Sequence, residues 1–234
     1  METSVIKTLA KALYAHISDE LKQYKKYTWN RLSRIDLSNS VSCHEFNDKI
    51  EEIRLKDTLS EAEQLLLLRT EFAALWAKTD NLELRIEMAK FIISQWGGIK
   101  RNSDKTIKTY ASSSPDNLCS SIKGISSKSK LLAAIDPKNY FVYDSRLYVY
   151  LNQFVESSST CRNLAVYFPK VPGWSRTAKN YEITNKTTKK RFSYCDYCQL
   201  IKEVGVCSQK DFQDFFNDDR LQFIEMTLYR LSKE

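Results

Sequence analysis

Residues that form tight turns are scarce in this chain. Its 234 residues include only five glycines and four prolines. A β-sandwich or barrel of this length needs many turns and therefore many more of both residue types. Hydrophobic residues make up 42% of the chain and charged residues 28%, which is ordinary for a globular protein. The sequence therefore predicts an all-α protein that is long enough to bury a core without disulfides.

Apolar residues recur with a helical period over most of the chain. They return every four residues from Val5 to Leu21, and Ser60 followed by Glu63 forms a capping box ahead of a strongly apolar segment. We expect helices over residues 4–22, 43–55, 61–78, 82–96, 116–122, 127–135, 145–154, 192–204 and 212–231.

Other local signals indicate where helices begin and where loops lie. Asp80 is expected to cap the helix that ends at residues 96–98, and Pro115 to open a short helix. Residues 99–114 are polar and basic and show no clear period. Residues 170–190 contain Pro172, Gly173 and many polar residues, so we expect the longest loop there.

Positive charge is concentrated in the second half of the chain. The net charge is +7 and the pI about 9.0. Residues 44–90 contain eleven acidic and seven basic residues, a net charge of −4. Residues 97–133 contain seven basic and two acidic residues, net +5, and residues 162–191 eight basic and one acidic, net +7. This distribution favours a polyanion such as nucleic acid as the partner.

Several classes of protein are disfavoured by what the sequence contains. Residues 1–14 are amphipathic rather than a signal peptide, and no apolar run has the length of a membrane span, so we expect a cytoplasmic protein with reduced thiols and no membrane partner. Cys195, Cys198 and Cys207 fall in an amphipathic segment, and we interpret them as core thiols rather than ligands. The histidines are isolated and no P-loop is present, so no metal or cofactor is expected.

The most informative segment is residues 118–147, LCSSIKGISSKSKLLAAIDPKNYFVYDSRL. A short helix meets a turn at Gly124, and a second helix then opens with serines. Amides at the start of such a helix can bind a phosphate, although a basic helical turn without a ligand would have the same pattern. The DNA contacts that we expect come from this segment and from the basic pair before it: Lys100, Arg101, Lys123, Gly124, Ser126, Ser127, Ser129 and Arg146.

This segment resembles the hairpin of helix-hairpin-helix DNA glycosylases, and most closely the small prokaryotic relatives of 8-oxoguanine glycosylase. The matching motifs are Leu-x-x-x-Ile-x-Gly-Ile-Ser-Ser-Lys from residue 118, Ser-Lys-Leu-Leu at 129–132 with Pro137, and Tyr-Asp-Ser-Arg at 143–146. Trp-Gly-Gly at 96–98 also fits that group. The chain departs from the family pattern at Lys123 and Ser126, where proline and glycine are usual.

The resemblance covers residues 96–151 and implies both a fold and a chemistry. It implies one glycosylase-like domain over 1–234, with two helical lobes around a cleft: an N-terminal lobe of about residues 1–96, and a hairpin and catalytic lobe of about 97–234. A bifunctional glycosylase attacks the sugar with a lysine amine, while a carboxylate stabilises the cationic sugar. Asp144 holds the carboxylate position and could also cap the helix after it.

Two lysines compete for the position of the nucleophile. The hairpin glycine points to Lys128, whereas the Ser-Lys-Leu-Leu motif points to Lys130. Residues two apart on a helix lie about 200° apart, so both cannot face one cleft. We favour Lys130 because the Ser-Lys-Leu-Leu context is the closer match to the family, and its apolar neighbours also suit a buried amine. Enzymes of this class also grip an extruded base with aromatic rings, and the candidates are Trp29, Trp96, Tyr140, Phe141 and Trp174.

The sequence therefore predicts a monomeric DNA glycosylase acting on double-stranded DNA that carries a modified or damaged base. A lysine nucleophile would make it an AP lyase as well. We favour a role in defence against phage DNA with hypermodified cytosine, because the N-terminal half matches no housekeeping enzyme. The alternatives are an 8-oxoguanine repair glycosylase with lyase activity and a non-catalytic DNA-binding helical module.

Overall fold

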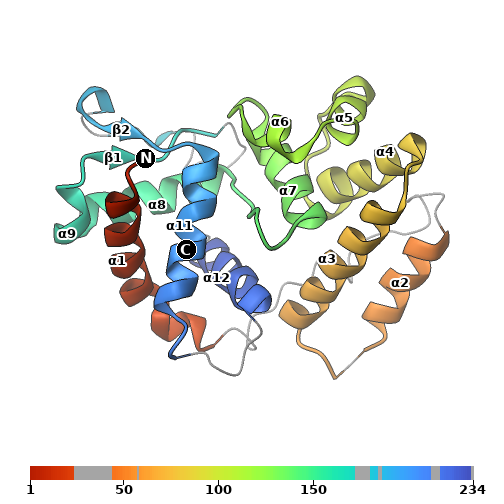
Figure 1. Ribbon diagram of the computed structural model, residues 1–234, viewed down its shortest axis with the longest axis horizontal. Helices are drawn as coiled ribbons and strands as arrows, with labels where there is room; N and C mark the ends of the chain where they lie inside the picture. The colour runs from red at the N-terminus through yellow and green to blue at the C-terminus, as the bar shows by residue number, and fades with distance from the viewer. Residues whose placement is uncertain (24–43, 57, 172–179, 184–185, 212–216, 233–234) are drawn as a thin grey trace. The chain divides into compact units, whose positions relative to one another are not determined.

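The chain is mostly helical, as its composition predicts (Figure 1). The computed structural model describes residues 1–23, 44–56, 58–171, 180–183, 186–211 and 217–232. Its elements are α1 (Thr3–Leu21), α2 (His44–Arg54), α3 (Glu61–Lys78), α4 (Leu82–Lys90), the π-helical turn η3 (Phe91–Trp96), α5 (Asp104–Ala111), α6 (Pro115–Cys119), α7 (Ile125–Ile135), α8 (Ser145–Ser157), α9 (Ser159–Arg162), β1 (Val166–Tyr167), the 3₁₀ turn η4 (Lys186–Thr188), β2 (Lys190–Arg191), α11 (Tyr194–Cys207) and α12 (Asn217–Leu231).

Local capping signals determine several helix starts. The predicted capping box opens α3, because the Ser60 hydroxyl accepts a hydrogen bond from the Glu63 amide while the Glu63 carboxylate accepts one from the Ser60 amide. The expected cap at Asp80 is wrong by one residue. Asn81 caps α4 instead, and its side-chain oxygen accepts from the amides at 83 and 84 at 3.0 and 3.3 Å.

The stretch 99–114, in which no period was recognised, contains helix α5. The Ser103 hydroxyl accepts from the Thr106 amide and starts this helix, which buries Ile107, Tyr110 and Ala111. Its exposed face is basic and polar, and this face masked the short apolar period. The following helices also differ from expectation, since α6 ends at residue 119 rather than 122 and α7 begins at 125 rather than 127.

One compact unit contains Met1–Tyr24, Cys119–Ser126 and Phe141–Glu234. Within it α1 packs on α11 and α12, and α8 packs on α9 and α12 (Figure 1). Strands β1 and β2 form a short parallel pair, with Val166 opposite Lys190. The strands and η4 lie at the edges of the segment that was expected to be a loop, because two-residue strands leave no periodic signal in a sequence.

The second unit contains Lys25–Leu118 and Ser127–Tyr140. Here α2 packs on α3, and α4 packs on α5. The Phe46 ring meets those of Phe72 and Phe91 edge-on, at centroid distances of 5.6 and 5.0 Å, and forms the centre of the core. Both units are discontinuous in sequence and thus differ from the expected division near residue 96. The difference arises because α1 buries its apolar face against α11 and α12.

Among the described residues, no helix has both the length and the apolar character needed to cross a membrane.

Candidate functional site

A tight turn joins α6 to α7 at the predicted position. Gly124 adopts a φ of 72°, a left-handed conformation that favours glycine, and α7 begins at the next residue. The Ile125 amide donates to the Ile122 carbonyl at 3.0 Å, and the Lys123 amide donates to the Ser121 hydroxyl at 3.2 Å. Lys123 and Gly124 are exposed. They therefore present to solvent the charge and the bare backbone that contact with a phosphate requires.

The serines that follow the turn lie mostly inside the protein. Ser126 is half-buried, whereas Ser127 is buried and accepts a hydrogen bond from the Asn102 side-chain amide at 2.9 Å. Ser129 is 0% exposed. The expected DNA contacts require exposed hydroxyls, whereas those of Ser127 and Ser129 belong to buried residues. Asn102, which the sequence did not single out, fixes the first turn of α7.

Lys130 lies on the buried face of α7. Its side chain is 5% exposed, and the next four residues of the helix are buried as well. The aliphatic stem of Lys130 passes directly over Gly97, because a β-carbon added to Gly97 would overlap its Cδ atom. The same β-carbon would lie 2.6 and 2.8 Å from the carbonyl oxygens of Ile93 and Ile92. Only glycine fits at position 97 without a shift of its neighbours.

A π-helical turn brings Gly97 to this place. The Gly97 amide donates to the Ile92 carbonyl, five residues back, at 2.9 Å, and the Ile99 amide donates to the Ile93 carbonyl at 3.0 Å. Wide turns of this kind are rare and often occur at functional sites. Trp96, the last residue of η3, is buried beneath Arg69, whose guanidinium carbon lies 5.5 Å from the centre of its ring. Trp96 is therefore a core residue here rather than an open face for a base.

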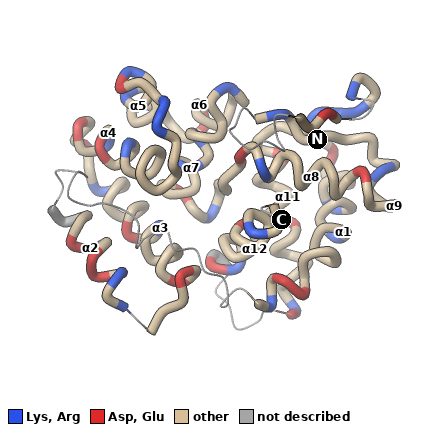
Figure 2. Tube along the Cα trace, turned by 180° about the vertical axis from the view of Figure 1, so that it is seen from behind, with Lys and Arg blue, Asp and Glu red and all other residues tan. Residues whose placement is uncertain are grey.

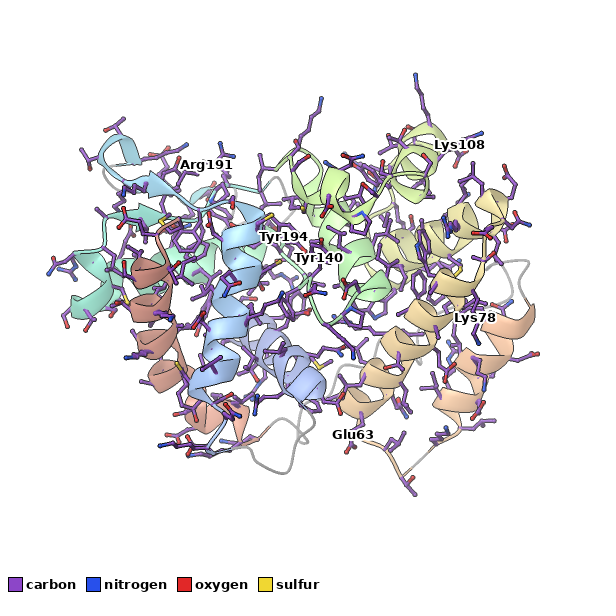
Figure 3. The ribbon with its side chains drawn as sticks, in the orientation of Figure 1. Glu63, Lys78, Lys108, Tyr140, Arg191 and Tyr194 are labelled. Atoms are coloured by element: carbon purple, nitrogen blue, oxygen red, sulfur yellow. The ribbon has the colours of Figure 1, made fainter. Side chains whose placement is uncertain are left out.

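The other basic candidates of this unit are more accessible. The Lys128 amine lies 5.9 Å from the centre of the Tyr110 ring, a cation–π distance, and its side chain is half-buried. Lys100 and Arg101 are exposed, as is Lys108 on α5, which is labelled in Figure 3. Basic residues occur along α5 and in the turn before α7 (Figure 2). Lys128 and Lys130 thus have different surroundings, as their spacing on the helix predicts.

Asp144 belongs to the other unit and caps α8, as its position before an apolar helix allows. Its Oδ1 atom accepts hydrogen bonds from the amides of Arg146 at 2.9 Å and Leu147 at 3.2 Å. Its Oδ2 atom accepts no hydrogen bond from any residue that the structure describes. The carboxylate is half-buried. One oxygen of the carboxylate is thus engaged at the positive end of a helix.

The three residues before Asp144 lie in neither a helix nor a strand and are held by tyrosine hydroxyls. Tyr194 on α11, labelled in Figure 3, donates to the Phe141 carbonyl at 2.8 Å. Tyr197 donates to the Val142 carbonyl at 3.0 Å, and Tyr143 donates to the carbonyl of Pro169 at 2.9 Å. Burial raises the pKa of each of these three hydroxyls well above its ordinary value, so they remain protonated donors.

Arg146 does not pair with Asp144. Its guanidinium carbon lies 6.0 Å from the centre of the Tyr229 ring on α12, and it makes no ion pair with a carboxylate of the described residues. The side chain is half-buried. Arg146 therefore lies against an aromatic ring rather than against the Asp144 carboxylate.

The aromatic candidates for a base pocket divide by burial. Phe141 is 0% exposed and belongs to the core together with Trp96, whereas Tyr140 is half-buried. Trp29 and Trp174 lie outside the described residues. Of the three candidates that the structure describes, Tyr140 is the most accessible.

The cysteines of α11 differ in accessibility. Cys195 is exposed and Cys198 buried, and burial raises the pKa of the Cys198 thiol to about 12. No group of three or more potential metal ligands occurs among the described residues.

Comparisons with protein-family models, with curated proteins and with solved structures find no match to this chain.

Sequence reasoning missed three residues that shape the candidate site: Asn102, Tyr194 and Tyr197. The tyrosines are three residues apart, so they share one face of α11, and this spacing was their only sequence signal. Nothing in the sequence pairs that face with the segment before Asp144, some 50 residues earlier.

Proposed function

We propose that this chain is a DNA glycosylase that excises a modified base from double-stranded DNA. The observation that carries the proposal is the arrangement of Asp144. Oδ1 is occupied by two amides of α8, Oδ2 is left without a donor among the described residues, and buried hydrogen bonds fix the preceding backbone. Such a carboxylate can stabilise the positive charge that develops on deoxyribose as the base departs.

The hairpin supports DNA as the ligand. Lys123 and the left-handed Gly124 are exposed directly before the first amides of α7, and this arrangement suits a backbone phosphate. Lys100 and Arg101 would add phosphate contacts within a region of net positive charge. Phosphate contacts of this kind give affinity without sequence preference and make binding depend steeply on salt.

Lys130 is the amine that we favour as nucleophile. The Lys130 nitrogen would form a bond to the sugar C1′ while the glycosidic bond breaks. The electron pair of the glycosidic bond leaves with the base. Loss of a proton from the nitrogen and opening of the sugar ring would then give the Schiff base. A side chain that is 5% exposed on an apolar helix face suits a desolvated lysine of this type. Lys128, which contacts the Tyr110 ring, is the alternative.

The first experiment presents the protein with duplexes that carry single modified bases and measures abasic sites. The set contains hydroxymethylated and glucosylated cytosine, 8-oxoguanine and unmodified DNA. We expect excision of a hypermodified cytosine, with 8-oxoguanine as the alternative substrate. Asp144→Asn should reduce the single-turnover rate by roughly 100- to 1,000-fold and leave DNA affinity unchanged, because the amide keeps the cap but not the charge. Unchanged excision by this variant would remove Asp144 from the mechanism.

Two further outcomes separate the alternatives. Salt-dependent binding without abasic product on any duplex would indicate the non-catalytic DNA-binding module. Borohydride should trap a covalent complex that Lys130→Met abolishes and Lys128→Met retains. The reverse result assigns the nucleophile to Lys128, and abasic product without any trapped complex assigns it to water.

A further inference from the structure

Tyr194 and Tyr197 hold the segment that leads into Asp144. Their side chains project from one face of α11, and their hydroxyls donate to the carbonyls of two consecutive residues, Phe141 and Val142, at 2.8 and 3.0 Å. The Tyr143 ring packs against that of Tyr197 with a centroid distance of 5.0 Å. These residues all belong to the same compact unit.

Side chains of α11 contact this segment at more than one point, since the Cys198 thiol also makes a hydrogen bond with the Phe141 backbone. The segment lies between α7 and α8, in neither a helix nor a strand, so its carbonyls have no partners from secondary structure. The Tyr143 hydroxyl anchors the next residue to the Pro169 carbonyl at 2.9 Å. Each of the three successive residues 141 to 143 is therefore restrained by at least one hydrogen bond, and Asp144 follows directly.

We propose that Tyr194 and Tyr197 are positioning residues that set the Asp144 carboxylate for catalysis. Phenylalanine would fill the same volume, so packing alone does not require the hydroxyls. Their hydrogen bonds fix the backbone at 141 and 142, and that backbone determines where the Asp144 side chain leaves the chain. The catalytic consequence rests on the proposed function, whereas the structural consequence for the α8 cap does not.

The test compares Tyr194→Phe and Tyr197→Phe with the matched control Tyr148→Phe. Tyr148 has a buried side chain in the same unit, and its hydroxyl donates to the backbone carbonyl of Tyr181 at 3.1 Å rather than to a carbonyl of residues 141–144. Two properties are measured in each protein. The first is catalysis, measured as the single-turnover excision rate together with the DNA affinity. The second is hydrogen exchange at the Arg146 and Leu147 amides that Asp144 caps.

We expect each α11 variant to lower the excision rate about tenfold with DNA affinity unchanged, because small displacements of a catalytic group are costly. Exchange at the two capped amides should rise relative to the rest of α8. Tyr148→Phe should change neither property.

Equal losses in all three variants would overturn the proposal, because they would reflect general loosening. Unchanged exchange at the capped amides in both α11 variants would also overturn it, whatever the enzyme does. If the wild-type protein excises no base but exchange rises only in the two α11 variants, the proposed function fails while the positioning of Asp144 stands.

Discussion

The two candidate catalytic residues are held in place by different physical means. Lys130 lies on an apolar face of α7, and its place depends on a missing side chain, because Gly97 leaves room for its stem. Asp144 lies half-buried at the start of α8, and its place depends on hydrogen bonds that tyrosine hydroxyls make to the backbone before it.

The difference determines how each residue can be disturbed. A residue held by close packing responds to added volume, whereas one held by hydrogen bonds responds to the loss of a single donor or acceptor. Added volume should therefore disturb the surroundings of Lys130, whereas the loss of a hydrogen-bonding group should disturb those of Asp144.

The largest effect is expected from Gly97→Ala. The new methyl group would overlap the Lys130 stem and two backbone carbonyl oxygens that cannot move away easily. We expect the free energy of unfolding to fall by about 3 kcal/mol, measured by urea denaturation. Gly98→Ala is the control, because Gly98 has open space around it and only its φ of 70° opposes a side chain, at a cost of about 1 kcal/mol. Equal losses in the two variants would refute close packing at position 97.

A smaller effect is expected at the α8 cap. Asp144→Ala removes the oxygen that accepts from two amides and should lower the free energy of unfolding by about 1 kcal/mol. Asp144→Asn keeps an acceptor at the same position and should cost much less. Urea denaturation of both variants measures the difference. If both lose the same stability, the cap is not what Asp144 contributes to the fold.

The hydrogen bond between Asn102, which precedes α5, and Ser127 on α7 should contribute still less to the free energy of unfolding. Asn102 donates to the buried Ser127 hydroxyl, so a double-mutant cycle of Asn102→Ala and Ser127→Ala should give a coupling of about 0.5–1 kcal/mol. The corresponding cycle of Asn102→Ala with Ser126→Ala serves as the control and should show little coupling. Additive losses in the first cycle would mean that the two side chains do not support each other.

The last prediction concerns reactivity rather than stability, and it tests whether the inner face of α11 is closed. Burial raises the pKa of the Cys198 thiol to about 12, so at pH 8 almost none of it is the reactive thiolate, whereas Cys195 is exposed. In variants that retain only one of these two cysteines, a thiol reagent should label Cys195 at least about 100-fold faster. Similar labelling rates would show that the face carrying Tyr194 and Tyr197 opens readily.

Features that depend on neighbouring residues could be predicted from the sequence. The Ser60 capping box, the helix start at Pro115 and the cap at Asp144 each depend on groups within three or four residues. Helix α5 was missed because its four lysines and threonines outnumber its three buried residues. Asp80 was preferred to Asn81 because both residues are good caps and only the backbone decides between them.

Features that join distant parts of the chain could not be predicted. The approach of Lys130 to Gly97 and that of Tyr197 to Val142 depend on how helices pack, and helical periodicity does not specify partners. Ser127 and Ser129 were expected to contact DNA because they open the helix that follows the Gly124 turn, yet both are buried. Sequence motifs could thus select candidate residues but not their surroundings.

The wide turn η3 makes the chain sensitive to length as well as to side-chain identity. A π-helical turn holds about one residue more than an α-helical turn. Deleting one residue between Phe91 and Gln95 would let this stretch return to α-helical spacing, and each residue of an α-helix advances by about 100°. Gly97 would then rotate away from the Lys130 stem, and a bulkier neighbour would take its place. The number of residues in this turn therefore matters as much as their identity, and a substitution, which keeps that number, cannot reveal it.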